Sequence, residues 1–203
     1  MAIKITFKKN FSEKNIRNYV LFTDEKFRIR GLNKLLLASK ANLINKTISS
    51  QDSTKKDFLL FNISSNQKII LIKIKNDQSS LENEKKGAEF YGFINSNLIL
   101  SSTFLENNIK ETCLKNKYFL NEFFHGLQLR SYEFNKYITK NKSKNFELIV
   151  SIKKHFNDFY KNKRFVSLTD GTNFTKDLVS EPGNILHPDE YAKRLNELKK
   201  FGL

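Results

Sequence analysis

Short, uninterrupted apolar runs constrain the fold of this chain more than any other feature. Residues 68–75 read KIILIKIK, and comparable runs recur along the sequence. The predicted strands lie at residues 2–7, 19–22, 56–63, 68–75, 97–100 and 146–152. Apolar runs of this kind are typical of strands that are buried on both faces of a sheet. The chain is therefore expected to place helices on both sides of its sheet.

Segments with helical periodicity separate these strands. They are predicted at residues 32–48, 79–93, 115–134, 163–179 and 188–201. The four residues 64–67, Ser-Ser-Asn-Gln, are typical of a turn and predict a hairpin between their neighbouring strands. Interleaved strands and helices predict an α/β fold with a mixed sheet between two helical layers, a three-layer αβα arrangement.

Charge and composition narrow the class of protein. The 203 residues carry a formal net charge of +15, which favours contact with polyanions such as nucleic acid. The lysines are spread along the chain in pairs rather than gathered in one block, so a solvating surface is the favoured interpretation. Cys113 is the single cysteine, which excludes an intrachain disulfide and fits a reducing compartment. No secretory signal or membrane-spanning run is seen, and the protein is expected to be cytoplasmic, with no membrane partner.

The residues do not form a recognisable catalytic or metal motif. His125, His155 and His187 lie far apart, and none has a second ligand at metal-binding spacing. Cys113 lacks the local signature of a nucleophile. No catalytic and no metal-ligating residue is therefore predicted.

One segment combines aromatic and basic residues. Tyr132, Phe134 and Tyr137 alternate with Arg130 and Lys136, a pattern that resembles a nucleic-acid-binding surface. A helix end that packs its rings while its charges face water is the favoured alternative.

Two motifs near the C-terminal end carry more information. The segment 171–198, GTNFTKDLVSEPGNILHPDEYAKRLNEL, follows the pattern A-R-D-L-x-N-x-P-x-N-x-L-x-P-x-x-[FY]-A. The matching residues are Asp177, Leu178, Pro182, Asn184, Leu186, Pro188, Tyr191 and Ala192. Thr175-Lys176 replaces Ala-Arg and Ser180 replaces Asn, and both changes are mild. Upstream, residues 126–137 contain Arg130 and Tyr132 in the pattern G-x-x-L-R-S-Y-x-F-x-x-Y.

The same residues predict a helix–turn–helix connector. Asp177 and Leu178 end one helix, and Pro182 with Gly183 breaks it. Pro188 suits the first turn of a new helix, and Gly202 suits its C-terminal cap. The motif residues are therefore expected to be architectural rather than catalytic.

Both motifs resemble the leucine aminopeptidase (cytosol aminopeptidase) family. The resemblance implies a macro-domain-like N-terminal domain over residues 1–160, with residues 161–203 as a linker helix and the start of a catalytic domain that is absent here. It also implies a leucyl aminopeptidase that removes N-terminal amino acids from peptides and works as a hexamer. In the family two divalent metals, zinc or manganese, bind to the catalytic domain. The family's N-T-D-A-E-G-R-L motif has no counterpart in this sequence, so no cofactor is assigned to this chain.

Two hypotheses of different classes follow. In the first, the chain is the N-terminal portion of a metal-dependent aminopeptidase, serves assembly and access to the active site, and is itself not catalytic. Its partners are then its own catalytic domain, further copies of itself and a peptide substrate. In the second, it is a basic binding module without peptidase activity, which takes DNA non-specifically or a nucleotide.

Overall fold

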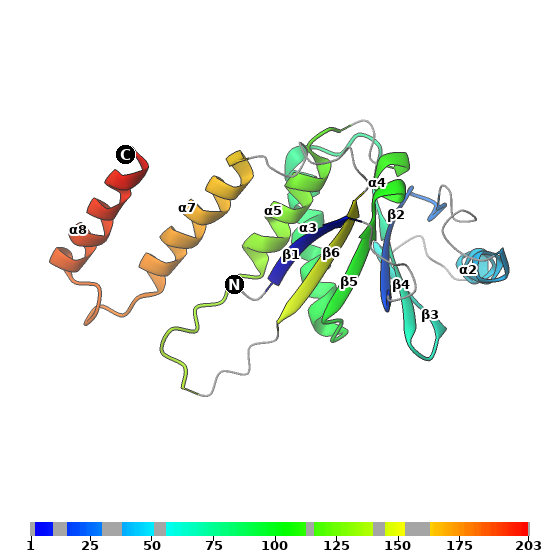
Figure 1. The fold of residues 1–203 in the computed structure, drawn as a ribbon, viewed down its shortest axis with the longest axis horizontal. Coiled ribbons are helices and arrows are strands. Elements are labelled where there is room, and N and C mark those ends of the chain that lie inside the picture. The colour runs from blue at the N-terminus through cyan, green and yellow to red at the C-terminus, as the bar shows by residue number, and fades with distance from the viewer. Residues whose placement is uncertain are drawn as a thin grey trace.

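The computed structural model describes residues 3–9, 16–29, 38–50, 56–112, 116–139, 145–152 and 163–202. A six-stranded sheet lies at the centre, with helices on both faces (Figure 1). The strands are β1 (Ile3–Lys9), β2 (Asn18–Thr23), β3 (Phe58–Ser64), β4 (Gln67–Lys73), β5 (Ser101–Leu105) and β6 (Phe146–Ile152). The helices are α2 (Ala38–Ser50), α3 (Ser80–Ser96), α4 (Glu106–Thr112), α5 (Phe119–Arg130), α7 (Lys163–Ser180) and α8 (Pro188–Asn196), which runs into the 3₁₀ turn η2 (Glu197–Phe201).

The sheet is mixed, as the sequence predicted. Its strand order is β1-β6-β5-β2-β4-β3, and every neighbouring pair is parallel except β3 and β4. That antiparallel pair is the predicted hairpin, and Ser65 and Asn66 form its turn. The three-layer α/β architecture is therefore confirmed.

The central strands are apolar throughout because both of their faces are buried. On β2, Val20 and Phe22 face the layer of α3 and α5, whereas Tyr19 and Leu21 belong to the core beneath α2. On β4, residues 69–72 divide between the two cores in the same alternating way. Alternation still sets which side chain faces which layer, but neither face requires polar residues.

The core between the sheet and α3/α5 is built from aromatic rings. The centre of the Phe22 ring lies 5.2 Å from that of Phe119 and 5.4 Å from that of Phe123, and both pairs are in edge-to-face arrangement. Phe90 and Phe104 complete the cluster, and all of these rings are buried. Edge-to-face ring pairs contribute beyond their buried area, which explains how a chain without tryptophan builds a dense core.

Two predicted elements need correction. The strand expected at residues 97–100 is wrong, because α3 continues to Ser96 and Leu98 then adopts a left-handed φ of 53°. The strand of this region is β5, which begins at Ser101. The helix expected over 115–134 is shorter, since α5 ends at Arg130 and Phe134 lies beyond it, packed against Tyr137.

Further differences from the predicted elements concern the last helix, an additional short helix and the first helix. The predicted helix over 188–201 divides into α8 and η2, and Gly202 caps it with a φ of 82°, as expected. Helix α4 was not predicted, because seven residues are too few for periodicity to show. The helix predicted over 32–48 is seen from Ala38 onward, and residues 32–37 lie outside the described part of the chain.

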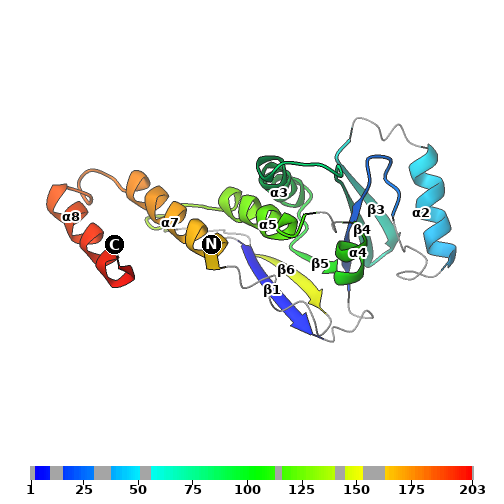
Figure 2. The ribbon, with the colours of Figure 1, turned by 90° about the horizontal axis from the view of Figure 1, so that it is seen from above.

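The C-terminal helices lie at the side of the sheet layers. Figure 2 shows α7 beside α5, with α8 further out. Thr169 is the one fully buried residue of α7, and α8 and η2 have none. Among the described residues no helix is long and apolar enough to cross a membrane.

Candidate functional site

The two sequence motifs meet at a junction between the end of α5, the segment 131–139, α7 and α8. Tyr132 donates a hydrogen bond of 2.7 Å to Asp177, which joins the upstream motif to the downstream one. The ammonium of Lys176 donates to the carbonyl of Leu129 at 2.8 Å and lies 5.2 Å from the centre of the Tyr132 ring. The structure thus brings together residues that are about 45 positions apart in the sequence.

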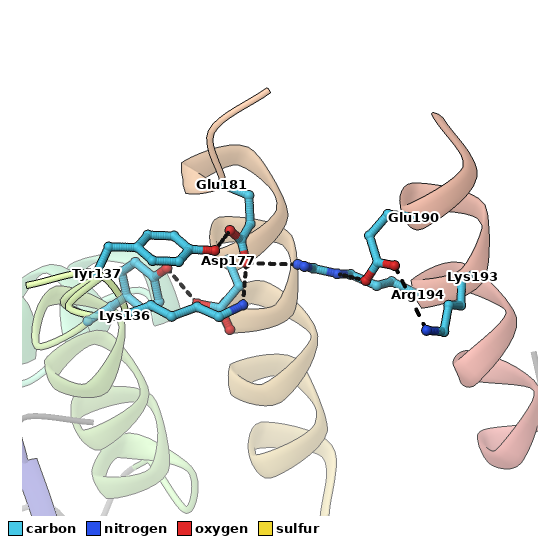
Figure 3. A network of polar contacts seen from close by, with 8 residues as sticks. Lys136, Tyr137, Asp177, Glu181, Glu190, Lys193 and Arg194 are labelled. Carbon is cyan, nitrogen blue, oxygen red and sulfur yellow. Dashed lines mark hydrogen bonds and ion pairs between the residues drawn. The ribbon is translucent and has the colours of Figure 1, made fainter. Parts of the chain in front are cut away.

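Glu181 is the centre of this junction (Figure 3). It directly follows α7, and its side chain is 1% exposed. Its Oε1 accepts from the Lys136 ammonium at 2.6 Å and from Arg194 Nη1 at 2.9 Å. Its Oε2 accepts from the hydroxyl of Tyr137. One carboxylate therefore connects the segment after α5 to both α7 and α8.

The electrostatics of the junction follow from this geometry. Hydrogen bonds from Lys136 and Tyr137, together with that from Arg194, lower the pKa of Glu181 to about 2. The same contacts raise the pKa values of Lys136, Tyr137 and Arg194. Every partner is thus held in the protonation state that keeps the network intact at neutral pH.

Arg194 holds α8 in its place. Besides Glu181 it binds Glu190 through Nε at 3.0 Å, one turn earlier in the same helix. Bonding to two carboxylates through different nitrogens fixes the orientation of the guanidinium plane. In Figure 3 this side chain reaches from α8 towards the end of α7.

The N-terminal half of α7 contacts α5 through a histidine, His125. Thr169 donates its hydroxyl hydrogen to the carbonyl of Phe165, so its oxygen must accept from His125 Nδ1, 2.9 Å away. His125 is buried and its ring lies 5.7 Å from that of Phe165. His125 is thus a packed histidine of the helix interface, and burial lowers its pKa.

A groove of about 530 Å³ lies between the segment 133–136, α7 and α8. Glu190, Lys193, Arg194 and Glu197 of α8 line it. Three apolar residues of α8 and η2 are on the outside instead, with Tyr191 44%, Leu195 38% and Phe201 71% exposed. Helix α8 therefore turns its charged face towards its own chain and its apolar face away from it.

The remaining motif residues shape the turn between α7 and α8. The carbonyl of Pro182 accepts from the amides of Ile185 and Leu186, and Pro188 occupies the first turn of α8. Leu178 lines the groove, whereas Asn184 and Ala192 are exposed. Arg130 ends α5, is exposed and has no hydrogen bond or ion pair within the described residues.

Lys136, Tyr137, Glu181 and Arg194 were not predicted as site residues. The aromatic–basic alternation at 130–137 is predicted to be a helix end that packs its rings while its charges face water. Arg130 does end α5 and is exposed, and Phe134 packs against Tyr137. Residues 132–135 are not helical, however, and Lys136 is paired as well as half-exposed. The pairing partner lies 45 residues away, and no spacing rule reaches that far.

Across the described part of the chain, no three His, Cys, Asp or Glu side chains are grouped so that they could hold a metal ion. The carboxylate of Glu181 is already saturated by three donors from its own chain. The arrangement can orient helices.

Comparison with known proteins supports the resemblance seen in the sequence. No family model matches the chain. A probable cytosol aminopeptidase of Rhodopseudomonas palustris is 37% identical over 82 residues, which are 38% of this chain and 16% of that protein. One of Phytoplasma mali is 34% identical over 87 residues, or 40% of this chain and 18% of that protein. The match spans less than a fifth of the length of these relatives.

Solved structures extend the similarity to the fold of nearly the whole chain. A mutant of tomato leucine aminopeptidase matches 99% of this chain and 43% of its own, with a TM-score of 0.69 and 16% identity. The bottromycin maturation enzyme BotP, solved in complex with Mn, matches 92% of this chain and 36% of its own, with a TM-score of 0.59 and 11% identity. The macrodomain of Thermus aquaticus DarG matches 74% of this chain and 99% of its own, with a TM-score of 0.50 and 9% identity. The macro-like fold and the resemblance to leucine aminopeptidases are thereby confirmed.

Proposed function

We propose that this chain is the N-terminal portion of a metal-dependent leucyl aminopeptidase, an enzyme that removes N-terminal amino acids from peptides. In this proposal residues 1–160 form the macro-like N-terminal domain. Residues 161–203 form the linker helix and the first helix of the catalytic domain. The chain itself serves assembly and access to the active site rather than the chemistry.

The observation that carries this proposal is the reversed orientation of α8. A helix that ends a folded unit normally buries its apolar stripe and exposes its charges. Here Tyr191, Leu195 and Phe201 are exposed, while Arg194 and Glu190 are used to fix the helix to α7. An apolar stripe of this kind is suited to a further layer of protein, and the catalytic domain is the layer that the family resemblance supplies.

The metals belong to the same proposal. By the family resemblance, the two divalent ions, zinc or manganese, are assigned to the catalytic domain and not to this chain. Two such ions would polarise a peptide carbonyl and lower the pKa of a bound water. The parent protein would be a homo-oligomer, a hexamer by resemblance, in the cytoplasm.

A peptidase assay tests the proposal. The chain of residues 1–203 is expected to be inactive on leucine amide with added Mn²⁺, whereas the product of a reading frame that continues into the N-T-D-A-E-G-R-L motif is expected to be active. Replacing Tyr191 and Leu195 by serine in the longer protein should lower its activity or its assembly. Leu81→Ser, on the 75% exposed Leu81 of α3, is the matched control. Activity of residues 1–203 alone would overturn the assignment.

The second candidate is a basic binding module. Residues 163–203 contain seven basic and six acidic side chains, so nearly all of the +15 charge lies in residues 1–162. Such a charge favours phosphate contacts, and affinity for DNA should then fall steeply as salt is raised. Binding that vanishes near physiological salt would reduce this candidate to surface charge.

A nucleotide ligand is less well supported than DNA. Ligands of α/β sheets bind outside the carboxyl ends of the strands, where the strand order reverses. Between β2 and β5 this place is bridged by Asn108 of α4, which accepts from the Phe22 amide at 2.7 Å and donates to the Phe22 carbonyl at 2.9 Å. Titration with ADP-ribose is expected to give no heat.

A further inference from the structure

A second cleft lies at the carboxyl ends of the parallel strands β2 and β4, one strand away from the bridge made by Asn108. Its volume is about 530 Å³, within the range of small-molecule sites. The loop after β2, the loop from β4 to α3 and the first turns of α3 form its walls, and Asp57 before β3 closes one side. It is remote in sequence from the α7–α8 junction and shares no residue with that groove.

The floor of the cleft is a rigid cluster of charges. Asp57 binds Lys73 at 3.2 Å and Lys86 at 2.8 Å, and these two side chains are 15% and 11% exposed. Each ammonium also lies near an aromatic ring, Lys73 near Phe27 at 5.5 Å and Lys86 near Phe58 at 5.6 Å. Burial tends to raise the pKa of Asp57, but the bonds from Lys86 and Lys73 outweigh it and lower that pKa. The floor is thus internally satisfied and held in place.

The loop after β2 is strained where it reaches the cleft. Phe27 is 2% exposed and has a φ of 56°, a left-handed conformation that is rare for an aromatic residue. Asp24 holds this loop by accepting from the amides of Lys26 and Arg28, both at 2.9 Å. Strain of this kind persists only where the surrounding contacts enforce it. Here it positions Glu25 at the cleft.

Four groups in the cleft have no hydrogen-bond or ion-pair partner among the described residues. These are the ammonium groups of Lys75 and Lys85, the carboxylate of Glu25, and the side-chain oxygen of Gln78, which is enclosed. Glu82 is not among them, because its carboxylate accepts from the Ser79 amide at 2.8 Å in the capping box of α3. The cleft therefore offers cationic donors together with an anionic acceptor, Glu25.

We propose that this cleft binds a small zwitterion, an α-amino acid or a short peptide. The carboxylate of the ligand lies towards Lys75 and Lys85, and its ammonium donates to Glu25. The lining carries four lysines and four carboxylates, so a ligand with both charges matches it. A simple anion would bind the lysines but would place a second negative charge near Glu25, which is unfavourable.

Amide NMR spectra of the 203-residue chain, titrated with leucine, test the proposal. Shifts are expected in residues 24–28, 74–79 and the first turns of α3. N-acetylleucine lacks the ammonium and leucinamide lacks the carboxylate, so each should bind about tenfold or more weakly, since each loses a charge-assisted hydrogen bond. Equal binding of leucine and either analogue, or no shift with leucine at high millimolar concentration, would overturn the proposal.

Variants locate the binding within the protein. The double variant Lys75→Gln/Lys85→Gln should lose leucine binding, and Glu25→Gln should weaken it. Lys4→Gln/Lys46→Gln removes two other exposed lysines and is expected to bind as the unmodified chain does. Unchanged leucine binding in the Lys75/Lys85 variant would contradict the proposed site. Because no peptidase activity is measured, this result is independent of the aminopeptidase assignment.

Discussion

Two glycines set the distance between α3 and α5, the helices that cover one face of the sheet. A Cβ on Gly87 would lie 1.8 Å from the carbonyl oxygen of Phe123, and one on Gly126 would lie 1.9 Å from that of Glu84. No side chain, not even a methyl group, fits at either position. The helices therefore approach each other more closely than larger residues allow, and this closeness packs the rings of α5 against the sheet.

Gly126→Ala is predicted to destabilise the protein by about 1–3 kcal/mol or more, because the added methyl group forces the two helices apart. Gly92→Ala, on the same helix as Gly87, is the control. Nothing lies within 4 Å of its Cβ position. In a helix interior alanine is favoured over glycine by about 1 kcal/mol, so this change should stabilise. Urea unfolding measures both, and equal signs for the two variants would disprove the close approach.

The stability of the protein is predicted to depend on pH through His125. Burial lowers its pKa below the ordinary value of 6.5, while Glu84 acts to raise it and Lys176 to lower it. The unfolded chain therefore binds the proton more readily, and stability should fall as the pH drops from 6.5 towards the folded pKa. His125→Asn keeps a donor for Thr169 and should remove this dependence. Thermal unfolding between pH 7 and pH 5 would show it, and an unchanged slope in the variant would contradict it.

At the scale of elements, α8 is held by polar contacts rather than by a core. Glu181 and Glu190 fix Arg194, and α8 buries none of its residues. Most helices in proteins are stabilised by packing of an apolar face. The placement of α8 against α7 therefore depends on a single carboxylate and its donors.

Glu181→Gln is predicted to loosen α8, seen as faster amide exchange over residues 188–196, because the charge that attracts Lys136 and Arg194 is lost. Glu197 lines the same groove and has no hydrogen bond or ion pair in the described residues. The control variant Glu197→Gln should therefore change the amide exchange of α8 little. Since the pKa of Glu181 is lowered to about 2, the contact should persist well below pH 4.5 and be lost as the pH falls towards 2. Unchanged exchange in Glu181→Gln would count against the role assigned to the junction.

At the scale of the whole molecule, the sheet and its covering helices are independent of the C-terminal helices. Both hydrophobic cores are formed by residues that precede residue 163, and Thr169 is the one fully buried residue of α7. A chain of residues 1–162 is therefore predicted to fold, with a loss of about 1–3 kcal/mol for the unpaired His125 and neighbouring groups. Circular dichroism with urea unfolding would check this, and an unfolded chain 1–162 would refute it.

The sequence by itself determined the layers, most of the elements and the resemblance to leucine aminopeptidases. Apolar runs such as residues 69–72 can be satisfied only between two layers, and the helix predicted to begin at residue 79 is α3, which starts with a capping box at Ser79 and Glu82. Local patterns suffice for such features because strand burial and helix capping are short-range effects.

Only the tertiary structure decided the strand order, the left-handed turn at Leu98 and the two candidate sites. The Asp57 cluster joins β3, β4 and α3, and the Glu181 network joins segments 45 residues apart. It also decided that α8 presents its charges inward and its apolar stripe outward. Periodicity shows that a helix has two faces, but which face meets the chain depends on partners such as Glu181 that approach through folding.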